Sequence, residues 1–279
     1  NLPISNASML DQGSTSAEVV SMSKAYHKNN RKTYYASETL HPYILDILET
    51  KCDVQNIDLK INNLDNISID QDTIGIMFQY PDTTGEINIP TELINDCNEN
   101  KSVVSCSTDL LALTKFKSPG EIGVDIAYGS AQRFGVPMYY GGPHAAFLSC
   151  KNDFLRLMPG RIVGKTIDQE NNQCFRLALQ SREQHIKKDK SISNICTSQA
   201  LLANISALYG IYHGNDGLKK IGNQIYDLTK RLNTILNILN IPVVNNNYFD
   251  TLTIRTNKSE EIYQDLKKNG YILFFDKNN

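Results

Sequence analysis

The chain has 279 residues, 41% of them hydrophobic, which is enough to bury one large core and a smaller appended domain. Its formal net charge of −2, with both signs mixed along most of the chain, argues against nucleic acid or an acidic membrane surface as a partner. The six cysteines form no CxxC pair and no Cys/His cluster with zinc spacing, and every apolar run is too short for a membrane span. We therefore expect free thiols in a reducing compartment, no metal and no membrane.

The N-terminal part alternates helices and strands. A helix is predicted over residues 8–28, with Ser5, Asn6 and Ser8 available to cap its start. The apolar run Thr73–Tyr80 is typical of a strand buried on both faces. Between these two elements we expect a strand at Thr33–Ser37, a helix at 41–52 and a strand at 57–61.

The same alternation continues through the middle of the chain. The expected elements are a helix at 90–98, a strand at 102–107, a helix at 110–115 and strands at 125–128 and 145–150. This order predicts an α/β fold with a mainly parallel sheet that helices cover on both faces. In such sheets ligands bind at the carboxyl ends of the strands.

The sequence predicts two domains, a large one over residues 1–215 and an incomplete small α+β domain over residues 216–279. A long helix at 198–212 stops at Gly214. The elements expected after it are a helix at 216–238, a strand at 248–255, a helix at 260–268 and a strand at 271–275.

Asp109 follows the strand at 102–107, where an acid could pair with the pyridinium nitrogen of pyridoxal phosphate (PLP). The lysine that binds this cofactor covalently would then follow the strand at 125–128. That segment contains no lysine, and the amide of Gln132 cannot replace one. Capping of the next helix is the alternative role of Asp109.

Three further groups of polar residues are candidates for a site. His144 follows paired glycines and could titrate or make a structural hydrogen bond. Arg182 could bind a carboxylate through two hydrogen bonds or join a surface ion-pair network. Asn6 and Ser8 could position a phosphate at a helix start or simply cap the helix.

Several segments together resemble the P-protein family of the glycine cleavage system. They are LPISNASMLDQGSTSAE (2–18), QYPDTTGE (79–86), residues 118–146, MPGRIVGKT (158–166), LALQSREQH (177–185) and SNICTSQALLANISALYGIYHG (193–214). The similarity covers nearly the whole chain and is thin only in the Asn-rich loops and after about residue 235.

The resemblance implies a fold-type-I PLP-transferase-like large domain and identifies the chain as an N-terminal-half fragment. The family's lysine lies in the C-terminal half, and Gln132 falls at the equivalent position here. The implied reaction is PLP-dependent decarboxylation of glycine, with transfer of the aminomethyl group to the lipoyl arm of the H-protein and release of CO2. This half would retain a vestigial pocket at Asp109 and Gln132, and would present Asn6, Ser8, His144 and Arg182 to the shared site.

The resemblance also implies partners and a compartment. We expect the C-terminal half of the P-protein, a second protomer and the lipoylated H-protein as partners, and the mitochondrial matrix, or alternatively a bacterial cytoplasm, as the location. Two alternatives stay open: a non-catalytic docking module of the same complex, and a freestanding PLP transferase that uses Lys115, Lys117 or Lys165.

Overall fold

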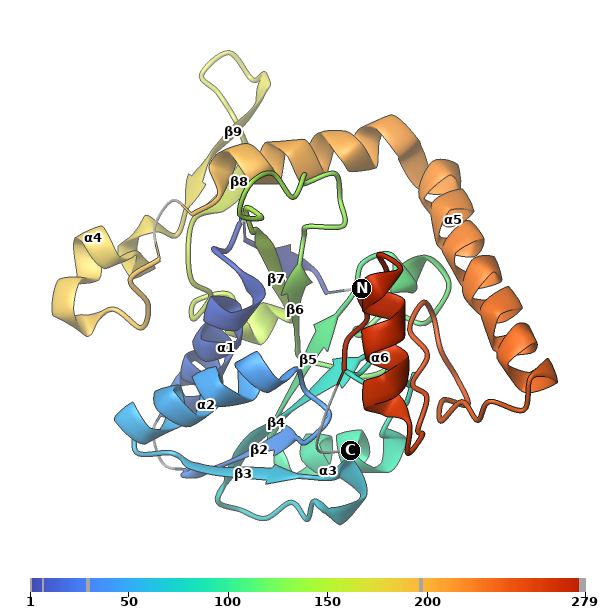
Figure 1. The fold of residues 1–279 in the computed structure, drawn as a ribbon. Helices are drawn as coiled ribbons and strands as arrows, with labels where there is room; N and C mark the ends of the chain where they lie inside the picture. The colour runs from blue at the N-terminus through green and yellow to red at the C-terminus, as the bar shows by residue number, and fades with distance from the viewer. Residues whose placement is uncertain (1, 7, 29–30, 196–197, 276–279) are drawn as a thin grey trace.

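The computed structural model describes residues 2–6, 8–28, 31–195 and 198–275 (Figure 1). They form a seven-stranded sheet, a two-stranded hairpin and six α-helices. The strands are β1 (Ile4–Ser5), β2 (Thr33–Ser37), β3 (Asp58–Asn62), β4 (Thr73–Tyr80), β5 (Val103–Thr108), β6 (Ile126–Ser130), β7 (Ala146–Cys150), β8 (Ile162–Ile167) and β9 (Gln173–Ala178). The helices are α1 (Gln12–Tyr26), α2 (Pro42–Val54), α3 (Thr91–Asn100), α4 (Gln184–Lys187), α5 (Ala200–Ile238) and α6 (Ser259–Lys268).

The large sheet is mainly parallel, which confirms the predicted fold class. Its strand order is β1-β7-β6-β5-β4-β2-β3, and the pairs from β3 to β6 are parallel. Only β7 and β1, at one edge, run antiparallel to their neighbours. The carboxyl ends of β4, β5 and β6 therefore lie together at one edge of the sheet, where an α/β fold places its ligands.

Helices cover both faces of this sheet (Figure 1). On one face α1 and α2 pack Val20, Ile44 and Leu48 into the same apolar cluster as Tyr128 of β6. On the other face α3 packs Leu93 and Ile94 against the opposite side of β4 and β5. All six residues of β5 are buried, so this strand needs apolar partners on both sides.

Two segments extend away from the sheet in Figure 1: the β8–β9 hairpin and α5. The sequence did not predict the hairpin. Helix α5 joins the two predicted helices at 198–212 and 216–238 across a kink at Gly214, whose φ is +59°. Its second half packs Ile221 and Ile225 near Leu111, Ala112 and Phe249. None of the helices described is long and apolar enough to cross a bilayer.

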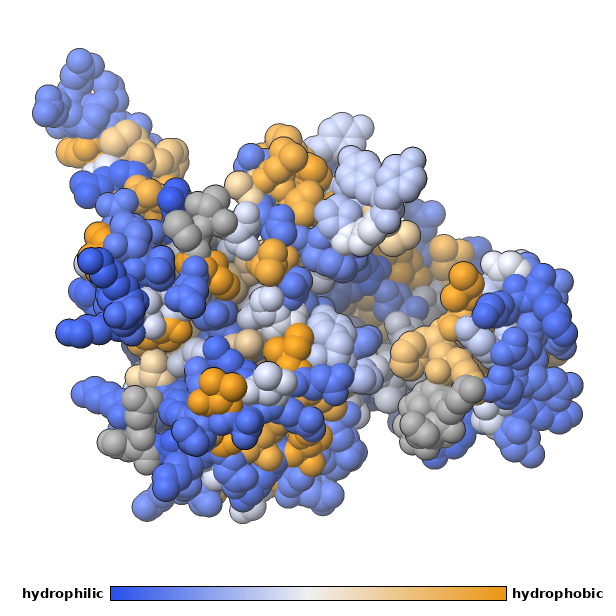
Figure 2. All heavy atoms as spheres, turned by 60° about the vertical axis from the view of Figure 1, so that its left-hand side comes forward, coloured by the Kyte–Doolittle hydropathy of each residue, from blue (hydrophilic) through white to orange (hydrophobic). Residues whose placement is uncertain are grey.

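Apolar side chains also reach the surface, and in Figure 2 they form patches separated by hydrophilic residues. On the first half of α5, Leu201, Leu208 and Ile211 are 71%, 63% and 77% exposed. Their spacing places them on one side of the helix.

The predicted strands at 248–255 and 271–275 are wrong. The first segment makes only isolated bridges, Glu86 to Tyr248 and Val243 to Ile254. Side chains accept backbone N–H groups in and just before this segment: the Glu86 carboxylate accepts those of Asn246 and Asn247, and Asn245 Oδ1 accepts that of Thr253. Residues 271–275 pair with no strand in the described part of the chain.

Two predicted helix starts also need correction. Helix α1 begins at Gln12, and the side chain of Asp11 caps it by accepting the N–H of Ser14 at 2.6 Å. Ser5, Asn6 and Ser8 therefore do not cap it, because they lie in or beside the strand β1 that precedes it. The helix predicted at 110–115 is a single 3-10 turn, Ala112–Thr114, since the Asp109 side chain closes a tight turn onto the N–H of Leu111.

A substitution at Gly75 in β4 tests how closely β4 and β5 pair. A Cβ atom at this position would lie 2.3 Å from the carbonyl oxygen of Val103 on β5. We expect Gly75→Ala to lower the free energy of unfolding by about 3 kcal/mol, because backbone atoms would have to move. Urea denaturation measures the change.

Gly210→Ala is the matched control, because a Cβ there meets nothing within 4 Å. Within helix α5 this change should raise stability by about 0.5–1 kcal/mol. Equal effects of the two substitutions would contradict the strand pairing described.

Candidate functional site

A charged triad lies at the carboxyl ends of β5 and β6. The guanidinium Nη1 of Arg133, three residues after β6, pairs with the carboxylate of Asp109, which directly follows β5. The same nitrogen lies 2.6 Å from Asp250 Oδ2, in the segment between α5 and α6. Arg133 also lies over the ring of the fully buried Phe249, with 5.7 Å between its Cζ and the ring centroid. One arginine thus joins the strand ends to the C-terminal segment.

The partners of Asp109 leave its carboxylate little freedom to bind a ligand. Its Oδ1 accepts the N–H of Leu111 at 2.9 Å, and its Oδ2 is paired with Arg133. Burial raises the pKa of Asp109, and the charge of Arg133 opposes that rise. Asp109 therefore stabilises the local turn and the triad.

Gln132 and His144 lie on either side of a glycine turn. Gly142, with φ +64°, has the Gln132 amide nitrogen 3.7 Å and His144 Nε2 3.9 Å from the point its Cβ would occupy. Gln132 is partly buried, and His144 is exposed. The two side chains border one space at the end of β6, close to Arg133.

The three candidate lysines do not meet at these strand ends. Lys115 donates to Asn223 Oδ1 at 3.2 Å and lies over the ring of Tyr226. Lys117 is exposed in the loop after the 3-10 turn, and Lys165 is on β8 of the projecting hairpin. Nothing in this arrangement offers an amine next to Asp109.

Asn6, Ser8 and Arg182 come together around residues 158–160, although the sequence separates them widely. Arg182 Nη1 donates to the carbonyl oxygen of Met158. The amide nitrogen of Asn6 and the carbonyl oxygen of Ser8 lie 3.7 Å and 3.8 Å from the point a Cβ of Gly160 would occupy. The structure thus divides the predicted site residues into this group and the group of Asp109, Gln132 and His144.

The sequence analysis missed Arg133, Asp250 and Glu183. Arg133 stands next to Gln132, but 117 positions separate it from Asp250, and no local pattern links them. Glu183 is 4% exposed, with Arg161 Nε at 4.0 Å and His185 Nδ1 at 3.6 Å from its carboxylate. No group of three potential metal ligands occurs among the residues that the structure describes.

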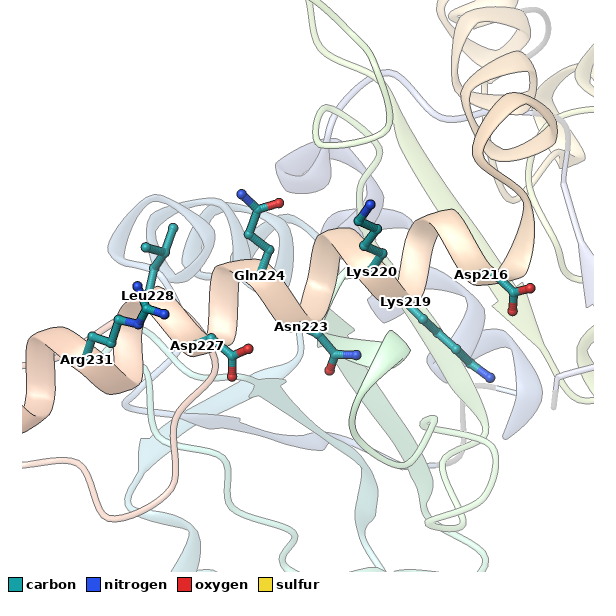
Figure 3. A pocket seen from close by; sticks show the side chains of 8 residues that line it. All are labelled: Asp216, Lys219, Lys220, Asn223, Gln224, Asp227, Leu228 and Arg231. Carbon is teal, nitrogen blue, oxygen red and sulfur yellow. The ribbon is translucent and has the colours of Figure 1, made fainter.

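A hollow of about 640 Å³ lies away from both groups, along the second half of α5 (Figure 3). All of its lining side chains project from this one helix, so it is an open surface and not an enclosed site. They are Asp216, Lys219, Lys220, Asn223, Gln224, Asp227, Leu228 and Arg231. Its mixed charges are typical of a solvated helix face.

The chain is similar to known proteins over nearly its whole length. The family model for the glycine cleavage system P-protein matches residues 1–278. The glycine dehydrogenase (decarboxylating) of Pelagibacter ubique is 44% identical over 272 residues, which are 96% of this chain and 28% of that protein. The mitochondrial glycine dehydrogenase (decarboxylating) of Pisum sativum is 44% identical over 94% of this chain and 25% of that protein. The chain spans little more than a quarter of the length of these curated relatives.

Solved structures show the same fold. The inhibitor-bound crystal structure of a glycine decarboxylase (P-protein) of the glycine cleavage system superposes with a TM-score of 0.87 at 28% identity, over 97% of this chain and 63% of that one. A C-DES variant with glycine covalently linked to its PLP cofactor superposes with a TM-score of 0.63 at 14% identity, over 96% of this chain and 73% of that one. The second likeness concerns the fold alone.

The ion pair between Arg133 and Asp250 can be tested with a double-mutant cycle. We compare Arg133→Met, Asp250→Asn and the double variant by urea denaturation, and we expect a coupling free energy of about 1 kcal/mol, because both side chains are about one-third exposed and water screens the pair. The pair Lys60–Asp58, at 3.6 Å and more exposed, is the control. Lys60→Met and Asp58→Asn should show no coupling. Additive effects of the Arg133 and Asp250 changes would contradict the bridge.

Proposed function

The chain belongs to the glycine cleavage system P-protein family, and we propose that it is part of an enzyme that decarboxylates glycine with PLP. In this proposal the aminomethyl group passes to the lipoyl arm of the H-protein, and CO2 is released. The family match over residues 1–278 and the names of the relatives support it. Because the chain spans about a quarter of those relatives, it contributes only some of the residues that the reaction needs.

PLP itself belongs to the partner half in this proposal. The cofactor supplies an electron sink for the carbanion left after loss of CO2. The strand ends of this chain do not fit it, because Gln132 cannot attach it covalently and Arg133 already pairs with Asp109. A partly buried acid that is already paired with an arginine of the same chain has no free charge for a pyridinium nitrogen.

The proposed role of this chain is to complete the active site and the dimer interface around the partner half. Asn6, Ser8 and Arg182 would face the shared site from one side, and His144 from the glycine turn. Asn6 and Arg182 have buried polar atoms without partners among the described residues, as expected for groups that another molecule satisfies. By covering the site they would exclude water, which favours the expulsion of a charged carboxylate as neutral CO2.

The proposed domain division follows the kink in α5. Residues 1–215 would form the lysine-less large domain, and residues 216–279 the start of a small α+β domain. Gly214 separates the two halves of the helix next to this boundary. The triad of Asp109, Arg133 and Asp250 would then join the two domains.

A second candidate function is docking without a part in the chemistry. The exposed apolar face of Leu201, Leu208 and Ile211 favours an interface, whether with the partner half, a second protomer or the H-protein. Docking and active-site completion differ in whether substitutions at Arg182 alter the reaction while the assembly stays intact.

The cellular compartment that we propose depends on the type of organism from which the chain comes. The relatives include a mitochondrial plant protein and a bacterial one. We propose the mitochondrial matrix for a eukaryotic source and the cytoplasm for a bacterial source.

Borohydride reduction tests the assignment of the cofactor. The full-length parent should catalyse exchange between bicarbonate and the carboxyl carbon of glycine in the presence of PLP and H-protein. After reduction, peptide mass spectrometry should find the pyridoxyl group on a lysine outside residues 1–279. An adduct on Lys115, Lys117 or Lys165 would show instead that this chain attaches PLP by itself.

The role of the apolar face of α5 as an interface can be tested by substitution. In the full-length parent, Ile211→Asp should dissociate the complex, because a carboxylate would be buried unpaired in the interface. Sedimentation velocity measures the oligomeric state. Val54→Asp is the control, since Val54 is 75% exposed at the end of α2 and should tolerate the charge. An intact assembly in both variants would rule out this face as an interface.

A further inference from the structure

A small hollow lies beside Arg182, between residues 156–160 and residues 191–195. Its volume is about 10 Å³, close to that of a single water-sized group, and it has an open side. Polar and apolar residues alternate around it, among them Met158, Gly160, Arg182 and Ser193. The hollow itself has room for about one water molecule, so a ligand would approach from its open side.

Arg182 presents two free donors there. Its Nη1 is used by the carbonyl oxygen of Met158, whereas Nε and Nη2 are buried and make no hydrogen bond to any described residue. Nε–H and Nη2–H lie on one edge of the planar guanidinium and point the same way. This edge matches the two oxygens of a carboxylate, which accept two parallel hydrogen bonds.

Asn6 is a second unsatisfied group close by. The residue is 9% exposed, and both its amide nitrogen and its amide oxygen are buried without a partner in the described part of the chain. Its amide nitrogen lies 3.7 Å from the point that a Cβ of Gly160 would occupy. Gly160 lines the hollow and has φ +71°, and its lack of a side chain leaves Asn6 close to the hollow.

The local charge favours an anion. Glu183 is the one buried carboxylate that lines the hollow, and Arg161, Arg182 and His185 surround it. Arg156 and Arg182 also line the hollow, so its lining carries one more cation than anions. Burial lowers the pKa of Arg182, and the charge of Glu183 opposes that fall.

We propose that Arg182 and Asn6 form a binding site for the carboxylate of a small free acid. Resting on the proposed function, that acid is the amino-acid substrate. The Nε–Nη2 edge of Arg182 receives both carboxylate oxygens, and the amide nitrogen of Asn6 donates to one of them. This edge has two donors, which satisfy both oxygens of a carboxylate but leave further oxygens of a tetrahedral phosphate without a donor.

The test uses the full-length holoenzyme, with acetate as the probe and inorganic phosphate as the comparison. Binding is measured by calorimetry and by competition with glycine. Arg182→Lys keeps the charge but removes the planar fork, and Arg182→Gln removes both. Asn6→Asp changes little in size but adds a negative charge at the site. Arg231→Gln, at an exposed arginine on α5, is the matched control.

We expect acetate to bind in competition with glycine, and to bind more tightly than phosphate. Arg182→Lys should weaken acetate at least tenfold and raise the KM for glycine by a similar factor. Arg182→Gln and Asn6→Asp should abolish acetate binding, and Arg231→Gln should leave it unchanged. A far-ultraviolet circular dichroism spectrum like that of the parent shows that each variant is folded.

Three results would overturn the inference: acetate affinity that does not depend on Arg182, acetate that binds without competing with glycine, or phosphate that binds more tightly than acetate. Glycine–bicarbonate exchange in the unsubstituted enzyme is measured alongside. Absence of that exchange would overturn the proposed function, whereas the dependence of acetate affinity on Arg182 tests the carboxylate site by itself.

Discussion

The pairing of β4 with β5 is the constraint on which the rest of the fold depends. Both strands lie in the middle of a parallel sheet and are buried on both faces, so each face requires a covering layer of helices. Helices α1 and α2 supply one layer and α3 the other. Because parallel strands need crossover connections, the loops that follow β4, β5 and β6 all gather at one edge. Asp109, Gln132 and Arg133 lie there for this reason.

The sequence predicted these central elements well because their signal is local. The continuous apolar run of β4 and the short strand β2 match the observed bounds, since both are buried along their whole length. The β8–β9 hairpin was missed because half of its strand residues are exposed and no apolar face marks it. The strand expected at 248–255 failed for another reason. The carboxylate of Glu86, about 160 positions away in the chain, takes backbone donors of this part of the chain, and a local pattern contains no trace of such a contact.

For the candidate site, too, the sequence predicted single residues but not the contacts between residues that are far apart in the chain. From the sequence, Gln132 was predicted to stand at the position of the family's lysine, and Asn6, Ser8, His144 and Arg182 were predicted as candidates; these assignments stay predictions. The sequence could not show that Asn6, Ser8 and Arg182 meet at residues 158–160, or that Gln132 and His144 flank one glycine turn. Arg133 was passed over although it stands beside Gln132, because its role depends on two acids from distant parts of the chain.

Arg133 also bears on how this part of the family could change. A single Gln132→Lys substitution would place an amine at the end of β6, but Asp109 would still be paired with Arg133. Releasing that acid requires a second substitution, and removal of Arg133 also breaks its contacts with Asp250 and Phe249. Conversion of these strand ends into a cofactor site would therefore pass through a less stable intermediate sequence. The ion pair thus favours retention of the present residues at the ends of β5 and β6.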